Sequence, residues 1–229
     1  MRGETAHFLL SIVQFKKPMI SKPDSLIFDM DGTLWDALDS YVKSWNEGAK
    51  IEKIDRVFTR SDLDHVMGWE RGKVLPFMFP DKTTAEQEKI YSTINRCRVN
   101  IIPKFGGILY DGVREGIIEL ASEYKLFIVS NCPKGVISQF KTWAVLQDYF
   151  VDEMEHGFNS MPKSHNMNLL MEKHRLKNPI YIGDTHGDSI DSKIASVPFA
   201  FVTYGFGTTQ EYDLKFDNFK SLAEYFMGL

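Results

Sequence analysis

Four short apolar runs, separated by segments with helical spacing, constrain the fold of this chain more than any other feature. The runs span residues 25–28, 126–129, 180–182 and 199–202. Continuous apolar runs bounded by polar turns are typical of parallel strands that are covered on both faces. Two of the intervening segments, 134–146 and 188–196, have helical spacing. Alternating strands and helices predict an α/β fold with a doubly wound parallel sheet.

The pattern changes between the first and second runs, where residues 36–100 contain no convincing strand. Tyr41 and Trp45 keep helical spacing, and 84–99 is a second long helical stretch. The predicted domains are a helical insert at 36–104 and a core formed by 23–35 and 105–229. Where the chain re-enters the core, we expect Asp111 to cap the helix that follows it.

The composition argues against several classes of protein. With 43% hydrophobic and 25% charged residues, the 229-residue chain is typical of a globular protein. A net charge of −4 without a block of Lys or Arg argues against nucleic-acid binding. Cys97 and Cys132 form neither a CxxC pair nor a zinc spacing, which suits a reducing cytoplasm. The apolar run at 7–15 is too short to span a membrane, so we predict a leader or arm at 1–22 and a cytoplasmic protein without a membrane partner.

The strongest local pattern follows the first apolar run, in the segment Asp29-Met30-Asp31-Gly32-Thr33. In open α/β sheets, ligands bind at the carboxyl ends of strands. Gly32 lets the backbone turn sharply and approach a ligand, and the N–H groups of such a turn can cradle an anion. The same residues also fit an Asx-type turn between a strand and a helix. The position after a buried strand favours a functional pair of carboxylates.

Polar residues that suit a phosphate ester follow at two later points in the chain. Ser130 and Asn131 come directly after the second apolar run, and a serine hydroxyl there can donate to a phosphate oxygen. Ser-Asn is also a common way to begin a loop. Lys163 precedes a helical stretch, although a lone lysine is usually a solvated surface charge.

A second acidic turn follows the third apolar run. Asp184 ends the run Ile180-Tyr181-Ile182-Gly183, and Asp188 comes four positions later. Clustered carboxylates repel one another unless a cation holds them together, and Mg²⁺ prefers hard oxygen ligands combined with substrate phosphate. Asp188 fits a helix N-cap about equally well.

Together, these segments resemble the four motifs of the haloacid dehalogenase-like hydrolases. In the order of that family, the matching segments are 29–33, Ser130, Lys163 and 183–188. The helical insert and the stretch 202–207 are similar to the phosphoglycolate-phosphatase-like branch, which has a small α-helical cap. The resemblance spans about residues 24–205 and implies a Rossmann-like core with an inserted cap domain. One departure is Met-Pro-Lys-Ser around Lys163, where the family often has Gly-Lys-Pro, and Lys134 is the alternative lysine.

The resemblance implies a role for each matching residue. Asp29 would be the nucleophile and become an aspartyl-phosphate, which splits one difficult step into two. Asp31 would protonate the leaving oxygen and later deprotonate the attacking water. Ser130, Asn131 and Lys163 would bind the phosphoryl oxygens, because phosphoryl transfer depends mostly on positioning and electrostatic stabilisation.

The resemblance also implies a Mg²⁺ site. Its ligands would be Asp29, the backbone carbonyl of Asp31, and Asp184. Asp188 would support this metal site or orient Lys163.

The implied function is Mg²⁺-dependent hydrolysis of a small phosphorylated metabolite, similar to a phosphoglycolate phosphatase, by a monomer or weak dimer. In this family the cap selects the leaving group, and Trp69 and Arg71 are candidate substrate contacts. Packing of Trp69 inside the cap and solvation of Arg71 are the alternative. The spacing Gly68-x-x-Arg71 also resembles the cap loop of β-phosphoglucomutase, so a phosphosugar mutase is the second candidate. A non-catalytic phosphate-binding regulator is disfavoured, because Asp29 and Asp31 are both present.

Overall fold

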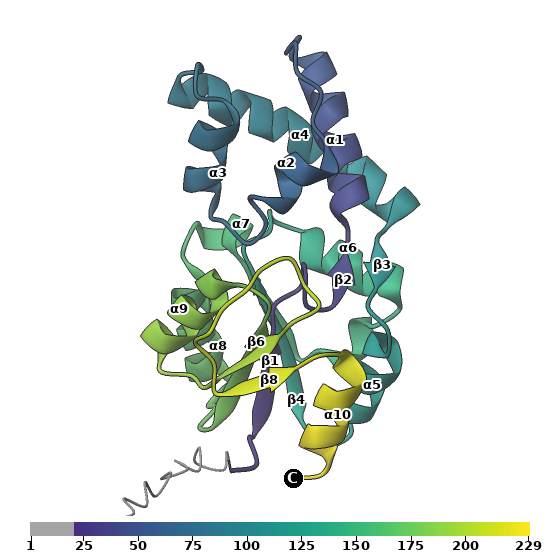
Figure 1. Cartoon of the computed structure of the whole chain (residues 1–229), viewed down its shortest axis with the longest axis vertical. Coiled ribbons are helices and arrows are strands. Elements are labelled where there is room, and N and C mark those ends of the chain that lie inside the picture. The colour runs from purple at the N-terminus through teal and green to yellow at the C-terminus, as the bar shows by residue number, and fades with distance from the viewer. Residues whose placement is uncertain (1–20) are drawn as a thin grey trace, which may run out of the picture.

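A central sheet of six parallel strands organises the molecule, in a computed structural model that describes residues 21–229. The predicted leader or arm at 1–22 therefore lies, but for its last two residues, outside the described residues. The strands are β1 (Ser25–Phe28), β4 (Lys125–Ser130), β5 (Asp152–Glu155), β6 (Pro179–Gly183), β7 (Phe199–Val202) and β8 (Leu214–Phe216). Their order across the sheet is β5-β4-β1-β6-β7-β8, and Figure 1 labels β4, β1, β6 and β8 of this sheet. The predicted α/β, doubly wound parallel sheet is confirmed.

The first strand lies at the centre of this sheet. Phe28 of β1 pairs with Ile128 of β4 on one side and with Ile182 of β6 on the other. The chain adds β4 and β5 on one side of β1 and then crosses over to add β6, β7 and β8 on the other. Such a reversal leaves a crevice at the carboxyl ends of the two strands that flank it, and ligands bind in that crevice. The ends of β1 and β6 therefore mark the expected position of a site.

Helices cover both faces of the sheet (Figure 1). One face carries α5 (Val113–Leu120), α6 (Val136–Ala144) and α10 (Phe219–Met227), and the other carries α8 (Lys163–His174) and α9 (His186–Ala195). Two short helices, η1 (Gln147–Tyr149) and α7 (His156–Asn159), flank β5. Phe28 stacks on Phe219 of α10 with ring centroids 6.0 Å apart, whereas Ile27 packs with Met167 of α8. Neighbouring residues of β1 therefore pack against the helices on opposite faces of the sheet. Each side chain of this size contributes roughly 1.5–3 kcal/mol to stability when it is fully buried.

The start of α5 differs from the prediction. Its N-cap is Gly112, in the left-handed region at φ 80°, and no side chain makes a cap hydrogen bond there. Asp111 therefore does not cap this helix. A left-handed turn at this point favours glycine, which adopts positive φ without a steric penalty.

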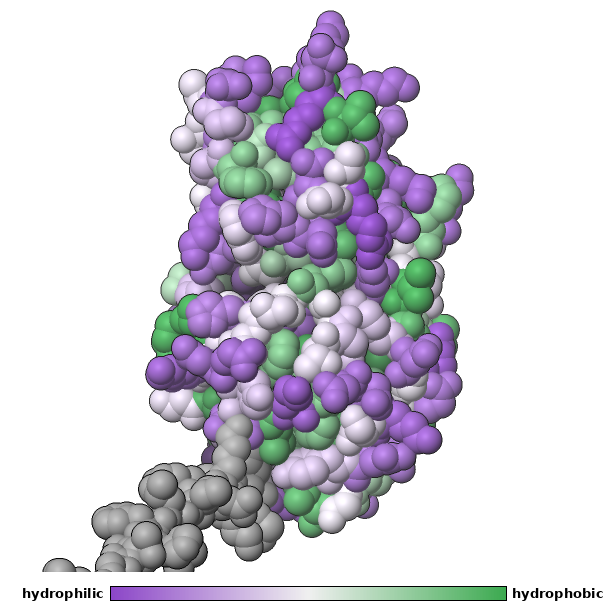
Figure 2. All heavy atoms as spheres, viewed as in Figure 1, coloured by the Kyte–Doolittle hydropathy of each residue, from purple (hydrophilic) through white to green (hydrophobic). Residues whose placement is uncertain are grey.

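A helical insert stands beyond one end of the sheet (Figure 1). The chain enters and leaves it through two short antiparallel strands, β2 (Trp35–Asp36) and β3 (Ile108–Leu109). Between them lie α1 (Leu38–Ile51), α2 (Arg60–Asp64), α3 (Arg71–Met78) and α4 (Thr84–Phe105). Within the insert, the ring of Trp45 lies 5.1 Å from that of Phe58 and 5.8 Å from that of Phe79, and these residues belong to the same hydrophobic cluster as Phe28 of β1. Its surface is mostly hydrophilic on the face that Figure 2 shows.

No helix among residues 21–229 combines the length and the apolar composition that crossing a membrane requires.

Candidate active site

Asp29 lies directly at the end of β1, in the crevice beside β6. Its backbone N–H donates to the carbonyl of Ile182 at 2.8 Å, which continues the pairing of the two strands by one residue. The side chain is only 3% exposed. Gly32, at φ 82°, then turns the chain away from the sheet. The fold therefore fixes the backbone of Asp29 through the sheet and leaves its carboxylate at the sheet edge.

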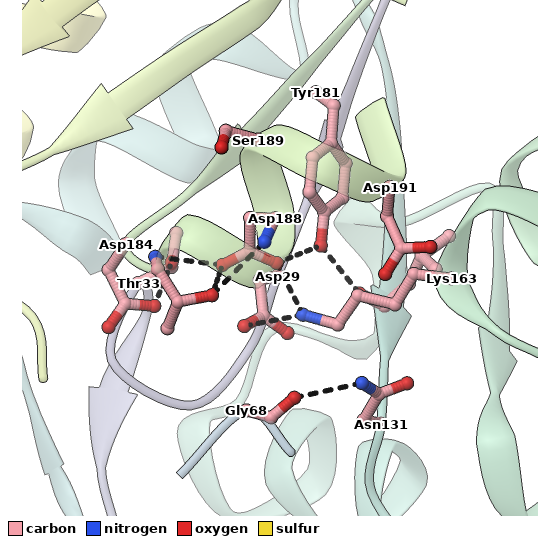
Figure 3. Close-up of polar contacts among 12 residues, drawn as sticks. Asp29, Thr33, Gly68, Asn131, Lys163, Tyr181, Asp184, Asp188, Ser189 and Asp191 are labelled. Atoms are coloured by element: carbon pink, nitrogen blue, oxygen red, sulfur yellow. Dashed lines mark hydrogen bonds and ion pairs between the residues drawn. The ribbon is translucent and has the colours of Figure 1, made fainter. Parts of the chain in front are cut away.

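Lys163 lies between two buried carboxylates (Figure 3). Its Nζ is 2.9 Å from Oδ2 of Asp29 and 2.6 Å from Oδ1 of Asp188, and all three side chains are nearly inaccessible to solvent. Lys163 is the first residue of α8, and the start of this helix lies beside the end of β1 although the two segments are far apart in the sequence. Lys134, the alternative lysine, is exposed and lies over the ring of Phe158. The structure thus brings Lys163, and not Lys134, to Asp29.

Asp188 has both oxygens occupied by hydrogen bonds. Oδ1 accepts from Lys163 Nζ and, at 3.0 Å, from the hydroxyl of Tyr181. Oδ2 accepts from the backbone N–H and the hydroxyl of Thr185, at 2.9 and 2.7 Å. Thr185 is the N-cap of α9, and Asp188 is its reciprocal partner in a capping box, so the alternative in which Asp188 itself is the N-cap is wrong. These contacts fix the carboxylate in a position that holds Lys163.

Asp184 follows β6 and is completely buried. Its Oδ2 accepts from the backbone N–H of Phe206 at 2.7 Å, and its Oδ1 accepts from the hydroxyl of Thr33 at 3.3 Å. The backbone at two glycines approaches the Asp184 side chain very closely. A Cβ added at Gly32 would lie 2.2 Å from Oδ2 of Asp184, and a Cβ added at Gly205 would lie 2.3 Å from the Cβ of Asp184. Only glycine fits at these two positions, so the turns after β1 and β7 are shaped around this carboxylate.

The charges in this cluster are unbalanced. Burial raises the pKa of Asp29 to about 7, against the attraction of Lys163. Burial and repulsion by Asp188 and Asp29 raise the pKa of Asp184 well above its usual range. Burial acts in the same direction on Asp188, but its ion pair with Lys163 and its hydrogen bonds lower its pKa overall. A single lysine therefore faces three buried carboxylates.

A divalent cation fits this arrangement. Asp29, Asp184 and Asp188 each offer a carboxylate oxygen, and these oxygens lie within 4.8 Å of one another. Oδ1 of Asp29 is buried and has no hydrogen-bond partner among the described residues. Hard oxygen donors of this kind are what Mg²⁺ and Ca²⁺ select, and a cation would supply the positive charge that the cluster lacks.

Asp31 has a different environment from Asp29. It is half-buried, and its Oδ1 accepts from the hydroxyl of Tyr41 at 2.8 Å and from Nε1 of Trp35 at 3.0 Å. Burial raises the pKa of Asp31 to about 6, although the hydrogen bond from Tyr41 and the positive charge of Arg98 lower it. Both donors use the same oxygen, so Oδ2 remains available to carry a proton. A carboxyl group with a pKa near neutrality suits proton transfer at physiological pH.

One cavity joins the residues that the sequence predicts to act on phosphate. Its lining includes Asp29, Asp31, Ser130, Asn131 and Lys163. About 690 Å³ of empty space lies among the lining residues, a volume that includes open solvent. Its remaining walls come mainly from the helical insert, so a ligand here contacts both parts of the chain.

The two predicted cap contacts also line this cavity. Trp69 is 38% exposed, and its ring lies 5.5 Å from those of His65 and Phe77. Arg71 is half-buried, and its Nε lies 3.5 Å from Oε1 of Glu88. The structure thus places both residues at the cavity, and it gives Arg71 an acidic neighbour of its own.

The side chain of Asn131 links the core to the insert. Its Nδ2 donates to the backbone carbonyl of Gly68 at 2.9 Å (Figure 3). Asn131 also lines the cavity, so this amide contributes both to the site and to the contact between the two parts of the chain.

The model of the haloacid dehalogenase-like hydrolase family matches residues 26–202. The chain belongs to this family. The matched segment begins in β1 and ends at the last residue of β7, so it includes the helical insert and each of the acidic, serine and lysine positions described above. No curated protein matches the chain at a significant level.

Solved structures of several other proteins have the same fold. A predicted phosphatase from Clostridium acetobutylicum is 22% identical, with a TM-score of 0.75 over 91% of this chain and 100% of that one. A haloacid dehalogenase-like family hydrolase from Streptococcus pneumoniae is 17% identical, with a TM-score of 0.76 over 90% and 99%. A predicted phosphoglycolate phosphatase from Haemophilus somnus is 19% identical, with a TM-score of 0.75 over 90% and 98%.

Two cavity residues of this haloacid dehalogenase-like chain were not identified as site residues from the sequence. Tyr41 follows the helical spacing of α1, which predicts a core residue and not a partner of Asp31. Arg98 is 6% exposed and lines the cavity from α4. The available indication was its position four residues after Ile94, on the buried face of an amphipathic helix.

Proposed function

We propose that this chain is a Mg²⁺-dependent phosphatase that hydrolyses a small phosphorylated metabolite through an aspartyl-phosphate on Asp29. The observation that carries this proposal is the state of the Asp29 carboxylate. Its Oδ2 is held by Lys163, while its buried Oδ1 has no partner among the described residues and the side chain lines the cavity. The names of two of the similar structures, a predicted phosphatase and a predicted phosphoglycolate phosphatase, support the same reaction class.

The reaction would proceed in two steps. In the first, the Asp29 carboxylate attacks phosphorus, the bond from phosphorus to the leaving oxygen breaks, and Asp31 gives its proton to that oxygen. In the second, Asp31 takes a proton from water, the water oxygen attacks phosphorus, and the bond to Asp29 breaks to release phosphate. Lys163 and Ser130, which line the same cavity, would bind the phosphoryl oxygens. Asp31 thus acts first as acid and then as base, which its raised pKa supports.

Asp29, Asp184 and the backbone carbonyl of Asp31 would hold the Mg²⁺. When bound, the ion would neutralise charge on these carboxylates and on the phosphoryl oxygens. We assign Asp188 mainly to the orientation of Lys163, because both of its oxygens already accept hydrogen bonds.

The division into domains is part of the proposal. Residues 36–104 would act as a cap over a core of 23–35 and 105–229, with β2 and β3 as the connections. The cap lines the cavity through Trp69 and Arg71, among others. A cap of this kind selects the leaving group and excludes water from the reacting atoms, as lids do in other enzymes.

A phosphatase assay tests the proposal. Purified protein would be assayed with p-nitrophenyl phosphate in Mg²⁺ and in EDTA, beside Asp29→Asn, which keeps the size of the side chain but removes the nucleophilic charge. We expect Mg²⁺-dependent release of phosphate that is lost in Asp29→Asn. Activity that persists in Asp29→Asn, or that is indifferent to EDTA, contradicts the mechanism. A panel of metabolite phosphates would then identify the preferred substrate.

A phosphosugar mutase is the second candidate, because Gly68 and Arg71 both line the cavity with the spacing of the β-phosphoglucomutase cap loop. A mutase would interconvert sugar phosphates with little net release of phosphate. The metabolite panel separates the two functions when sugar phosphates are followed by product analysis as well as by free phosphate.

A further inference from the structure

Arg98 is a buried cation in the wall of the cavity. It belongs to α4 of the insert, and the residue is 6% exposed. The cavity that it lines also contains Asp29, Asp31 and Lys163. A guanidinium keeps its positive charge at any physiological pH. Its burial therefore needs an explanation, because a charge removed from water is stable only when it is paired.

In the part of the chain that the structure describes, the charge of Arg98 acts on Asp31 and lowers its pKa, but the two residues form no ion pair. The Nε of Arg98 is buried and has no hydrogen-bond acceptor there, and no described acidic group forms an ion pair with it. Its contact is with the ring of Tyr41, whose centroid lies 5.0 Å from the guanidinium carbon. The two other cations that line the cavity are paired, Arg71 with Glu88 and Lys163 with two aspartates. Among the cations that line this cavity, within residues 21–229, Arg98 is thus the one that forms no ion pair.

The neighbours of Arg98 indicate which part of a substrate it faces. The hydroxyl of Tyr41 donates to Oδ1 of Asp31, so the ring beneath the guanidinium also positions the carboxyl group that protonates the leaving oxygen. Lys163 and Ser130, which would bind the transferred phosphoryl group, come from the core, whereas Arg98 comes from the insert. Arg98 therefore lies next to the leaving-group end of a bound ester.

We propose that Arg98 binds a second oxyanion, a carboxylate or a further phosphate, on the leaving group of the substrate. This inference rests on the proposed phosphatase function and narrows its substrates to phosphate esters that carry another anionic group. The planar guanidinium can form two parallel hydrogen bonds to such an oxyanion, and Nε is one of the donors that this geometry uses. A neutral leaving group would leave the guanidinium buried without an ion pair and its Nε without an acceptor among the described residues. The side chain would thus be the specificity determinant of the cavity.

Two pairs of substrates, each matched for the ester but not for the second charge, test this proposal. The carboxylate pair is 2-phosphoglycolate and ethyl phosphate, and the phosphate pair is fructose 1,6-bisphosphate and fructose 6-phosphate. The ratio of kcat/KM within each pair would be measured for the wild type and for Arg98→Met, which keeps the length of the side chain. Arg96→Met is the matched control, because Arg96 is on the same helix but is exposed and does not line the cavity.

We expect the wild type to prefer the doubly anionic member of one pair, and the pair that shows the preference identifies the oxyanion. Arg98→Met should reduce that preference about ten- to hundredfold, as the loss of a charged hydrogen-bond pair implies. Arg98→Lys should retain part of it, and Arg96→Met all of it. Thermal unfolding should show no loss of stability in Arg98→Met, because the substitution breaks no ion pair and removes a buried charge. A purely structural arginine would lower stability and reduce kcat/KM equally for both members of each pair, and this result overturns the proposal.

A binding measurement keeps the test valid in the absence of turnover. Titration of 2-phosphoglycolate and of fructose 1,6-bisphosphate into Asp29→Asn, with and without Arg98→Met, reports the same interaction as a ratio of Kd values. Equal Kd values for both ligands in the two proteins contradict the role of Arg98. If no ester is hydrolysed, the proposed phosphatase function fails. If p-nitrophenyl phosphate is hydrolysed with dependence on Asp29 but Arg98 has no effect on the ratios, only the present inference fails.

Discussion

Replacing Tyr41 with phenylalanine should move the alkaline limb of the phosphatase pH profile to higher pH. The hydroxyl of Tyr41 donates to Oδ1 of Asp31 at 2.8 Å, and this hydrogen bond is one of the effects that lower the pKa of Asp31, which burial raises to about 6. The donor stabilises the ionised carboxylate, so its removal favours the protonated form. The phenylalanine ring preserves the contact with Arg98 and fills the same volume.

The size of this effect follows from the type of hydrogen bond. A hydrogen bond to a charged group contributes about 1.5–3 kcal/mol, and 1.36 kcal/mol corresponds to one pH unit. The limb should therefore move upward by roughly one to two pH units. In the first step Asp31 must be protonated, so kcat/KM is high below its pKa and falls above it. Nε1 of Trp35 still donates to the same oxygen at 3.0 Å, which favours the lower end of this range.

The assay is kcat/KM for p-nitrophenyl phosphate as a function of pH, at saturating Mg²⁺. Tyr91→Phe is the control: Tyr91 lines the same cavity, but no hydrogen bond joins it to Asp31 in the part of the chain that the structure describes. We expect the profile of Tyr91→Phe to match that of the wild type. An unchanged limb in Tyr41→Phe, or one that moves to lower pH, would refute the assignment of Asp31 as the acid that Tyr41 positions.

Three further substitutions test the site and its support. Lys163→Met leaves two buried carboxylates without their cation and should lower the free energy of unfolding by about 3–5 kcal/mol in urea denaturation, whereas Lys134→Met, at the surface, should have almost no effect. Gly32→Ala would place a Cβ 2.2 Å from Oδ2 of Asp184, so it should abolish Mg²⁺-dependent turnover and the rise in Tm on adding Mg²⁺. Asp152→Asn should lower the free energy of unfolding by about 1 kcal/mol at pH 7. Burial acts to raise the pKa of the Asp152 carboxyl group, but its basic partners on α8 lower that pKa overall. The difference in stability from the wild type should therefore vanish as the pH falls through the lowered pKa.

The central strands of the fold were predictable because their composition is dictated by burial. The apolar run 25–28 and the run 199–202 coincide with β1 and β7. The structure also contains β5, with the sequence Asp-Glu-Met-Glu, and β8, and the prediction lacked both. These strands lie at the two edges of the sheet, so each pairs with another strand along one side only. Charged residues on an edge strand protect its free side against pairing with other protein chains. Their sequences therefore carry little of the apolar pattern on which the prediction depends.

The candidate site likewise contains residues that the sequence could predict and one that it could not. Asp29 and Asp184 directly follow β1 and β6, and Ser130 is the last residue of β4. The ends of these strands meet at one edge of the sheet, so the sheet alone brings the three residues together. Arg98 reaches the cavity from a helix of the insert, and its position depends on how the insert packs against the core. Spacing within α4 shows that Arg98 lies on the buried face, but it contains no information about what that face covers.

The most direct measurement of the central claim is to trap the phosphorylated intermediate. The protein would be mixed with substrate and Mg²⁺, quenched in acid during turnover, and treated with borohydride, which reduces an aspartyl-phosphate to homoserine. Peptide mass spectrometry then locates the reduced residue. We predict homoserine at position 29 in the wild type and none at that position in Asp29→Asn. Turnover with no reduced residue at position 29, or with the product at a different aspartate, would contradict Asp29 as the nucleophile.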